Sequence, residues 1–157
     1  MNPLLTVCVS HTYKGSAERV FDAWLTPVQA VRFLFATRTG NILRCEMTPH
    51  VGGGFVITDR RPDSDGEESL FEAEHHGRYI EIDRPRRLVF DFSVPPGLPT
   101  RVTIDIAAQE PGTCELTLTH EMDDSDEARE YEEFTRRGWT RMLETLEREF
   151  FPRRITL

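Results

Sequence analysis

Hydrophobic and polar residues alternate along several short stretches of the chain, and this period of two predicts β-strands with one buried face. The clearest apolar sets are Leu88, Phe90 and Phe92, then Val102, Ile104 and Ile106, then Cys114, Leu116 and Leu118. Proline- and glycine-containing turns separate the stretches, as in an antiparallel meander. Together with residues 5–13 and shorter runs from residue 42 onward, the pattern predicts one sheet of six or seven strands.

A helical period replaces the alternation after the first strand, in the string "GSAERVFDAWLTPVQAVRFLF". Ser16 is the expected N-cap of a first short helix. Thr26 is the expected N-cap of a second, with Pro27 at its first position and Gln29 completing a capping box. Two short helices in succession are therefore predicted.

A long helix is predicted over residues 125–151, where Asp124 and Glu127 form a capping box and Pro152 marks the end. One stripe of this helix carries Tyr131, Phe134, Gly138, Met142, Leu146 and Phe150, flanked by Trp139 and Leu143. The apolar face of an antiparallel sheet needs a cover, and only this helix is long enough to cross it. The expected fold class is α+β, with residues 1–157 forming a single domain.

Composition and charge restrict the partners. The 157 residues are 38% hydrophobic and 29% charged, as in an ordinary globular protein. No apolar run approaches the roughly 18 residues of a membrane span, and the N-terminus lacks the features of a signal peptide, so we expect a cytoplasmic protein. The formal net charge of −8 disfavours nucleic acid and anionic membranes as partners.

Neither a metal nor a cofactor is expected. Cys8, Cys45 and Cys114 are dispersed without CxxC spacing, which argues against a zinc site and a disulfide framework. All three lie in apolar runs, and we expect them to be small buried hydrophobic residues. The glycines of "VGGGFVI" (51–57) precede a strand rather than a helix, so they indicate a turn and not a dinucleotide site.

The strand through residues 71–82 changes the parity of its apolar positions part-way, so it must absorb one extra residue. Gly77 is the expected bulge. His75 and His76 directly precede it, and adjacent residues on a strand point to opposite faces, so the pair is a poor metal chelate. The sequence leaves open which of the two faces inward.

His120 continues the inward parity of Leu116 and Leu118. An imidazole that borders an apolar cavity can have its pKa moved to a catalytically useful value, so His120 is the candidate catalytic residue. The alternative, which we favour, is that it hydrogen-bonds a neighbouring group at the cavity rim. Parity places Asp91 and Asp105 on the outer face, and no pair of carboxylates is expected to point inward.

The order of these elements, with particular strings, resembles the SRPBCC (START-like, helix-grip) superfamily. The strings are "SAERVFDAWLTP", "GGGFVI", "HHGRYIEIDRPRRLVFDF", "CELTLTH" and "GWTRMLETLE". Within the superfamily they are most similar to the single-domain family named for activators of the heat-shock protein 90 ATPase. The resemblance implies a curved antiparallel sheet that grips the C-terminal helix, with an apolar ligand cavity between them.

Residues expected to line that cavity are Trp24, Phe33, Phe55, Phe90, Phe92, His120, Gly138, Trp139 and Met142. A glycine inside a helix costs roughly 1 kcal/mol against alanine. Gly138 therefore marks either a close approach of helix and sheet or a space left for a ligand. The resemblance favours the second interpretation.

Three functions follow as hypotheses. The leading one is binding or carrying a small apolar molecule. The second is an enzyme of the cyclase, dehydratase or hydrolase kind, with His120 as acid or base. The third is a chaperone cofactor or another interaction module, although true activators carry an additional N-terminal chaperone-binding domain, which makes a chaperone partner doubtful. A homodimer stays open.

Overall fold

The sheet has seven strands in the order β1-β7-β6-β5-β4-β3-β2 across the residues that the computed structural model describes, which are 4–37, 40–63 and 66–152. All six neighbouring pairs are antiparallel. The strands are β1 (Leu4–Tyr13), β2 (Asn41–Met47), β3 (Gly54–Asp63), β4 (Gly66–Asp83), β5 (Arg87–Ser93), β6 (Thr100–Ala108) and β7 (Cys114–Asp123). The predicted antiparallel sheet of six or seven strands is confirmed.

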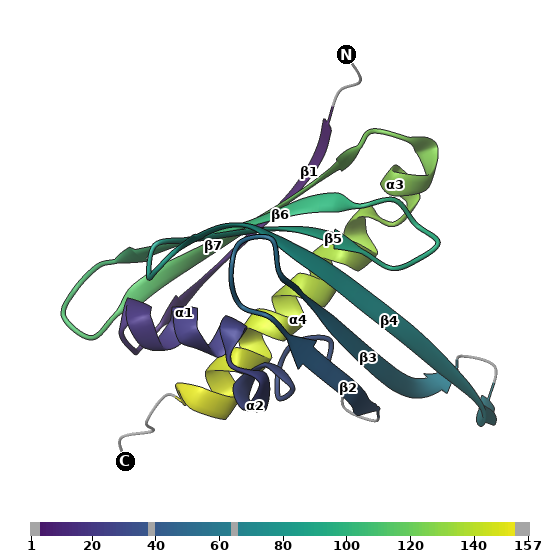
Figure 1. Ribbon diagram of the computed structural model, residues 1–157, viewed down its shortest axis with the longest axis horizontal. Coiled ribbons are helices and arrows are strands. Elements are labelled where there is room, and N and C mark those ends of the chain that lie inside the picture. Colours follow the sequence, from purple (N-terminus) through teal and green to yellow (C-terminus); the bar gives the residue numbers. More distant parts are fainter. Residues whose placement is uncertain (1–3, 38–39, 64–65, 153–157) are drawn as a thin grey trace.

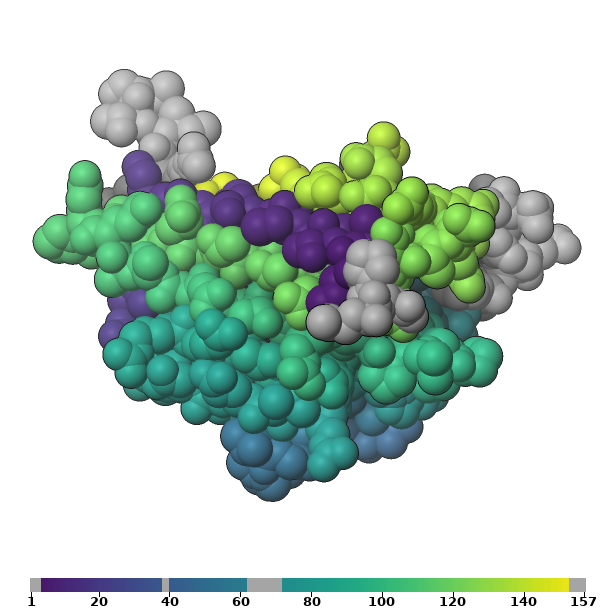
Figure 2. Space-filling view, turned by 90° about the horizontal axis from the view of Figure 1, so that it is seen from above, coloured from purple at the N-terminus to yellow at the C-terminus, as the bar shows by residue number. Residues whose placement is uncertain are grey.

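The helices are α1 (Ala17–Leu25), α2 (Pro27–Ala30), α3 (Asp126–Glu130) and α4 (Glu132–Phe150). Helix α4 lies across the curved sheet, and α1 and α2 lie near its C-terminal end (Figure 1). Strand β1 lies beside the C-terminal helical residues at the sheet edge (Figure 2). Ser16 caps α1 as predicted, since its Oγ accepts a hydrogen bond from the Arg19 amide at 3.2 Å. The curved sheet with α4 lying across it forms the helix-grip arrangement.

Thr26 is the N-cap residue of α2 and Pro27 begins the helix, as predicted. The expected capping hydrogen bond is missing, because the Thr26 hydroxyl donates to the Asp22 carbonyl at 2.7 Å instead. Ser125, not Asp124, caps α3 through the Ala128 amide at 3.0 Å. The Asp124 carboxylate instead pairs with the Arg129 guanidinium, a bidentate contact that satisfies it more strongly than an amide would.

The prediction of one helix over residues 125–151 is wrong. The chain leaves the helical conformation at Tyr131, with φ −98° and ψ 4°, which separates α3 from α4. Helix α3 buries none of its side chains, so no packing keeps it in line with α4. Tyr131 and Phe134, expected on the inward stripe, are 54% and 69% exposed.

The bulge of β4 is not at Gly77. The register between β4 and β5 shifts between Tyr79 and Glu81, whereas the pairing with β3 is continuous through Gly77. Gly77 lies opposite Phe55, and a Cβ atom on it would come 2.0 Å from Cε1 of that ring. The glycine therefore makes room for an aromatic side chain.

The expectation of three buried cysteines is also wrong. Only Cys114 is buried, while Cys45 is half-buried and Cys8 is exposed. Val7, the neighbour of Cys8 on β1, takes the inward position. Because successive strand residues face opposite sides, Cys8 must point outward.

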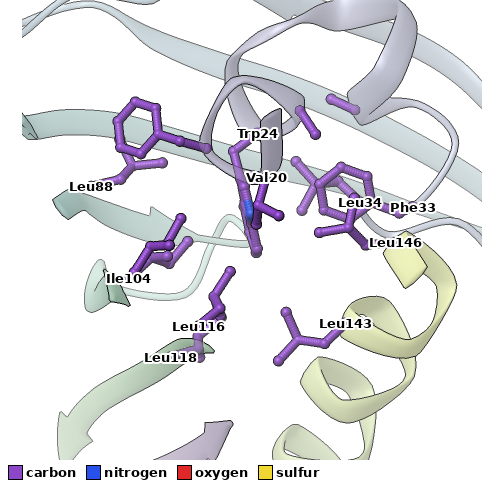
Figure 3. Packing of buried hydrophobic residues seen from close by; sticks show 14 of the residues in the cluster. Val20, Trp24, Phe33, Leu34, Leu88, Ile104, Leu116, Leu118, Leu143 and Leu146 are labelled. Atoms are coloured by element: carbon purple, nitrogen blue, oxygen red, sulfur yellow. The ribbon is translucent and has the colours of Figure 1, made fainter. Parts of the chain in front are cut away.

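The hydrophobic core fills one end of the grip, between α1, α2, the sheet and the C-terminal half of α4 (Figure 3). Trp24 and Phe33 pack edge-to-face there, with ring centroids 5.1 Å apart. Leu143 and Leu146 cover them from α4. The cluster also includes Trp139, from the N-terminal half of α4.

Candidate ligand-binding pocket

A pocket of about 540 Å³ lies beside the N-terminal half of α4, and such a volume suits a small molecule. Its walls come from the segment after α2, from β3, β4, β5 and β7, and from α4. The lining residues are Phe35, Ala36, Thr37, Asp59, Arg61, Ala73, His75, Phe92, Val94, His120, Phe134, Thr135, Arg137, Gly138, Trp139, Arg141 and Met142. The pocket is therefore mainly apolar, with a few buried polar groups and arginines.

Flat aromatic faces make up one wall. The Phe35 ring stacks on the His75 imidazole, with centroids 3.8 Å apart and planes 7° from parallel. Phe92 stacks on the same phenylalanine at 5.4 Å and 12°. Trp139 from α4 completes the group at 6.0 Å from Phe35. Such a wall can contact the face of a flat apolar molecule.

Phe35 is held in an uncommon backbone conformation. Its φ of 56° is in the left-handed region, which a bulky residue rarely adopts. The Phe35 amide donates to Sδ of Met142 at 3.3 Å, and its ring is 8% exposed. Contacts with α4 and β4 thus hold a strained residue in the pocket wall.

His120 lies inward, 4% exposed, and both of its ring nitrogens have partners. Nδ1 accepts a hydrogen bond from the Trp139 indole Nε1–H at 3.0 Å. The neutral ring therefore carries its proton on Nε2, which donates to Oγ1 of Thr100 at 2.7 Å. The Thr100 hydroxyl in turn donates a hydrogen bond to the Phe92 carbonyl at 3.2 Å. This chain of hydrogen bonds joins β7, β6, β5 and α4 behind the pocket.

Burial lowers the pKa of His120 to about 4, so the ring is neutral near pH 7. A general base needs a free lone pair, and Trp139 occupies the only one on this ring. The arrangement matches the hydrogen-bonding alternative for His120. It supports a structural role and not acid–base catalysis.

Asp59 on β3 and His75 on β4 form a second polar group of the pocket. His75 is 7% exposed, and its Nδ1 lies 3.1 Å from the Ile57 carbonyl, to which it donates. The same nitrogen is 3.7 Å from Oδ1 of Asp59, and Nε of Arg61 is 3.5 Å from Oδ2. Burial lowers the pKa of His75 to about 4 and raises the pKa of Asp59.

Gly138 faces the pocket from α4. A Cβ atom at this position would meet no heavy atom within 4 Å. The glycine therefore does not serve a close approach of helix and sheet. It leaves space.

The structure gathers five of the nine residues predicted for the cavity, which are Phe92, His120, Gly138, Trp139 and Met142. The other four lie outside it. Trp24 and Phe33 belong to the core under α1 and α2, and Phe55 packs edge-to-face on Phe90 at 5.4 Å. The core extends further along the sheet than the sequence pattern indicated, which moves the pocket toward α3.

The sequence analysis did not predict Asp59, His75 and Phe35 among the pocket residues. Asp59 shares the strand parity of Phe55 and Ile57, and this alternation could have placed its carboxylate inside. The parity of Ala73 could likewise have shown that His75 faces inward. No sequence signal points to Phe35, because its position depends on a left-handed turn after α2.

The described part of the chain shows neither a cluster of metal ligands nor a membrane-spanning helix. Across residues 4–37, 40–63 and 66–152, no three histidine, cysteine or acidic side chains come together as metal ligands would. The helices in those ranges are also too short or too polar to span a membrane.

The fold defines a helix-grip protein, and residues 14–150 match the family described as "Activator of Hsp90 ATPase homolog 1-like protein". The chain belongs to this family, as the sequence resemblance indicated. No curated protein matches it.

Solved structures with the same fold come from several bacteria. Protein CV1439 from Chromobacterium violaceum is 20% identical, with 94% of this chain and 99% of that one covered and a TM-score of 0.76. A protein from Rhodobacter sphaeroides is 22% identical, with coverage of 90% and 89% and a TM-score of 0.74. CalU16 from Micromonospora echinospora is 17% identical, with coverage of 91% and 74% and a TM-score of 0.64. At these identities the likeness concerns the fold alone.

Proposed function

We propose that this protein binds a small, mainly apolar molecule in the pocket between α4 and the sheet. The observation that carries the proposal is the open space at Gly138, where the inner face of a helix lacks a side chain and nothing packs against it. A glycine there has no use in a filled core, where it would cost helix stability. The aromatic wall of Phe35, Phe92 and Trp139 offers the apolar surface that such a ligand needs.

The test is to fill the space. Gly138→Leu should weaken binding of the apolar dye Nile red by about tenfold or more, since the new side chain occupies the ligand volume. Thr140→Leu, on the exposed side of the same helix, is the matched control and should leave dye binding unchanged. Equal dye affinities of the wild type and the folded Gly138→Leu variant would exclude this pocket. Native mass spectrometry of protein purified without added ligand would then identify any molecule that copurifies.

The enzyme hypothesis finds no support at His120, whose two ring nitrogens are both engaged. A binding or carrying role needs no free acid or base. A binding role therefore accounts for the pocket without a catalytic group.

A further inference from the structure

Asp59 is a pocket residue whose carboxylate oxygens both lack a hydrogen-bond donor among the described residues. Its side chain lies on the pocket wall and the residue is 1% exposed. Neither carboxylate oxygen receives a hydrogen bond from the described residues. Nε of Arg61 and Nδ1 of His75 are 3.5 and 3.7 Å from its oxygens, and the His75 proton is already directed at the Ile57 carbonyl.

A buried carboxylate with no hydrogen bond is costly, and native proteins rarely retain one without a reason. Exposed carboxylates of this protein illustrate the usual arrangement. Asp91 on β5, for example, accepts from the Arg101 guanidinium at 2.9 Å. Asp59 differs because its oxygens border the space that the proposed function assigns to a ligand.

From this placement we infer that Asp59 accepts a hydrogen bond from a neutral O–H or N–H group on a flat aromatic ligand. The inference rests on the proposed function and names the class of molecule that the pocket takes. The stacked rings of Phe35 and His75 lie on the same wall as the carboxylate, and His75 contacts both groups. A planar ligand lying against the aromatic wall would therefore bring an edge substituent to Asp59.

The donor should be neutral because the pocket already holds a cation beside Asp59 and two more along its lining. The Arg61 guanidinium lies 3.5 Å from Asp59, and Arg137 and Arg141 also line the pocket. A ligand ammonium would be repelled by these groups and would lose its hydration on entering. A phenolic hydroxyl or a ring N–H carries no charge, so it avoids the repulsion and loses much less hydration free energy.

Equilibrium dialysis with three naphthalenes tests the inference. The probes are 2-naphthol, which donates a hydrogen bond, 2-methoxynaphthalene, which cannot, and 2-naphthylmethylammonium, which is cationic. Wild type should bind 2-naphthol about tenfold more tightly than the methyl ether, because a buried acceptor discriminates against a ligand that leaves it unpaired. The ammonium compound should bind most weakly.

Variants assign the preference to one side chain. Asp59→Leu keeps the branching of the side chain and removes the acceptor, so its affinities for the naphthol and the ether should become equal. Asp59→Asn, nearly isosteric, should reduce the preference several-fold and serves if the leucine variant does not fold. Asp105→Leu replaces an exposed aspartate on β6 and should keep the wild-type ratio.

Each outcome separates this inference from the proposed function. Equal affinities for naphthol and ether in wild type, or an unchanged ratio in Asp59→Leu, would overturn the role of Asp59 while the pocket remains a binding site. Tightest binding of the ammonium compound would overturn the neutral donor. If no naphthalene binds while Nile red does, this inference fails and the proposed function stands. If neither binds, both fail.

Discussion

The Trp139 indole donates its hydrogen bond to Nδ1 of His120 across 3.0 Å, and this contact joins α4 to the strand β7 at the back of the pocket. Both residues are nearly fully buried. The bond fixes which nitrogen of the imidazole carries the proton and orients the ring toward Thr100. His120, which the sequence analysis considered as a catalytic residue, thus helps to hold α4 in position.

Trp139→Phe should destabilise the protein more than Trp24→Phe. Both changes remove an indole N–H and similar apolar volume, but Nε1 of Trp24 has no hydrogen-bond partner among the described residues. The Trp139 change leaves a buried acceptor on His120 unpaired, which costs about 1–3 kcal/mol beyond the loss of volume. Urea denaturation of the two variants measures the difference. Equal losses would mean that the bond contributes nothing.

A second matched pair tests the tether between β1 and α4. The Tyr13 hydroxyl donates to the Leu143 carbonyl at 2.9 Å, whereas the buried Tyr79 hydroxyl has no partner among the described residues. Tyr13→Phe should lower the free energy of unfolding by about 1 kcal/mol, and Tyr79→Phe should leave it unchanged or raise it. Burial raises the pKa of both phenols, so neither is ionised in the folded protein below pH 10. A larger loss from the Tyr79 change in chemical denaturation would contradict this assignment.

Glycine-to-alanine changes should have opposite signs at two positions. Gly138→Ala should raise the free energy of unfolding by up to about 1 kcal/mol, because a helix gains an alanine in open space. Gly77→Ala should lower it, because the new Cβ would lie 2.0 Å from the Phe55 ring and force it to move. Thermal melts of the two variants are the measurement. A melting temperature of Gly138→Ala well below wild type would show close packing of α4 on the sheet.

The stability of the protein should fall on acidification between about pH 6.5 and 4. Burial lowers the pKa of both His75 and His120 from 6.5 to about 4 in the folded state. The unfolded chain therefore binds protons first, which favours unfolding by roughly 3 kcal/mol per histidine once the pH is below both values. Asp59 acts in the opposite direction, since its raised pKa adds stability that is present at low pH and lost as pH rises.

The contribution of one histidine can be isolated. His120→Gln should reduce the slope of unfolding free energy against pH in this window by up to about 1.4 kcal/mol per pH unit, which corresponds to one proton. His50→Gln, at an exposed position before β3, is the control and should keep the wild-type slope. Identical slopes in all three proteins would show that His120 is not neutral and buried as described.

The strands and their inward faces were predictable from the sequence because alternation is a local property of the chain. Val102, Ile104 and Ile106 on β6 are buried as their parity required, and His120 lies inward with Leu116 and Leu118 on β7. The same parity predicted that His75 and His76 point to opposite faces. Element order and the family strings were sufficient for the helix-grip fold.

Only the tertiary structure decided which apolar residues form the core and which border a space. Trp24 and Phe90 are as apolar as Phe92 and Trp139, but of these four only Phe92 and Trp139 line the pocket. The break at Tyr131, the left-handed turn at Phe35 and the open space at Gly138 also depend on segments far apart in the chain. Sequence periodicity indicates which face of a strand or helix each residue lies on. A pocket forms where the side chains of the facing element leave space unfilled, and periodicity does not indicate this.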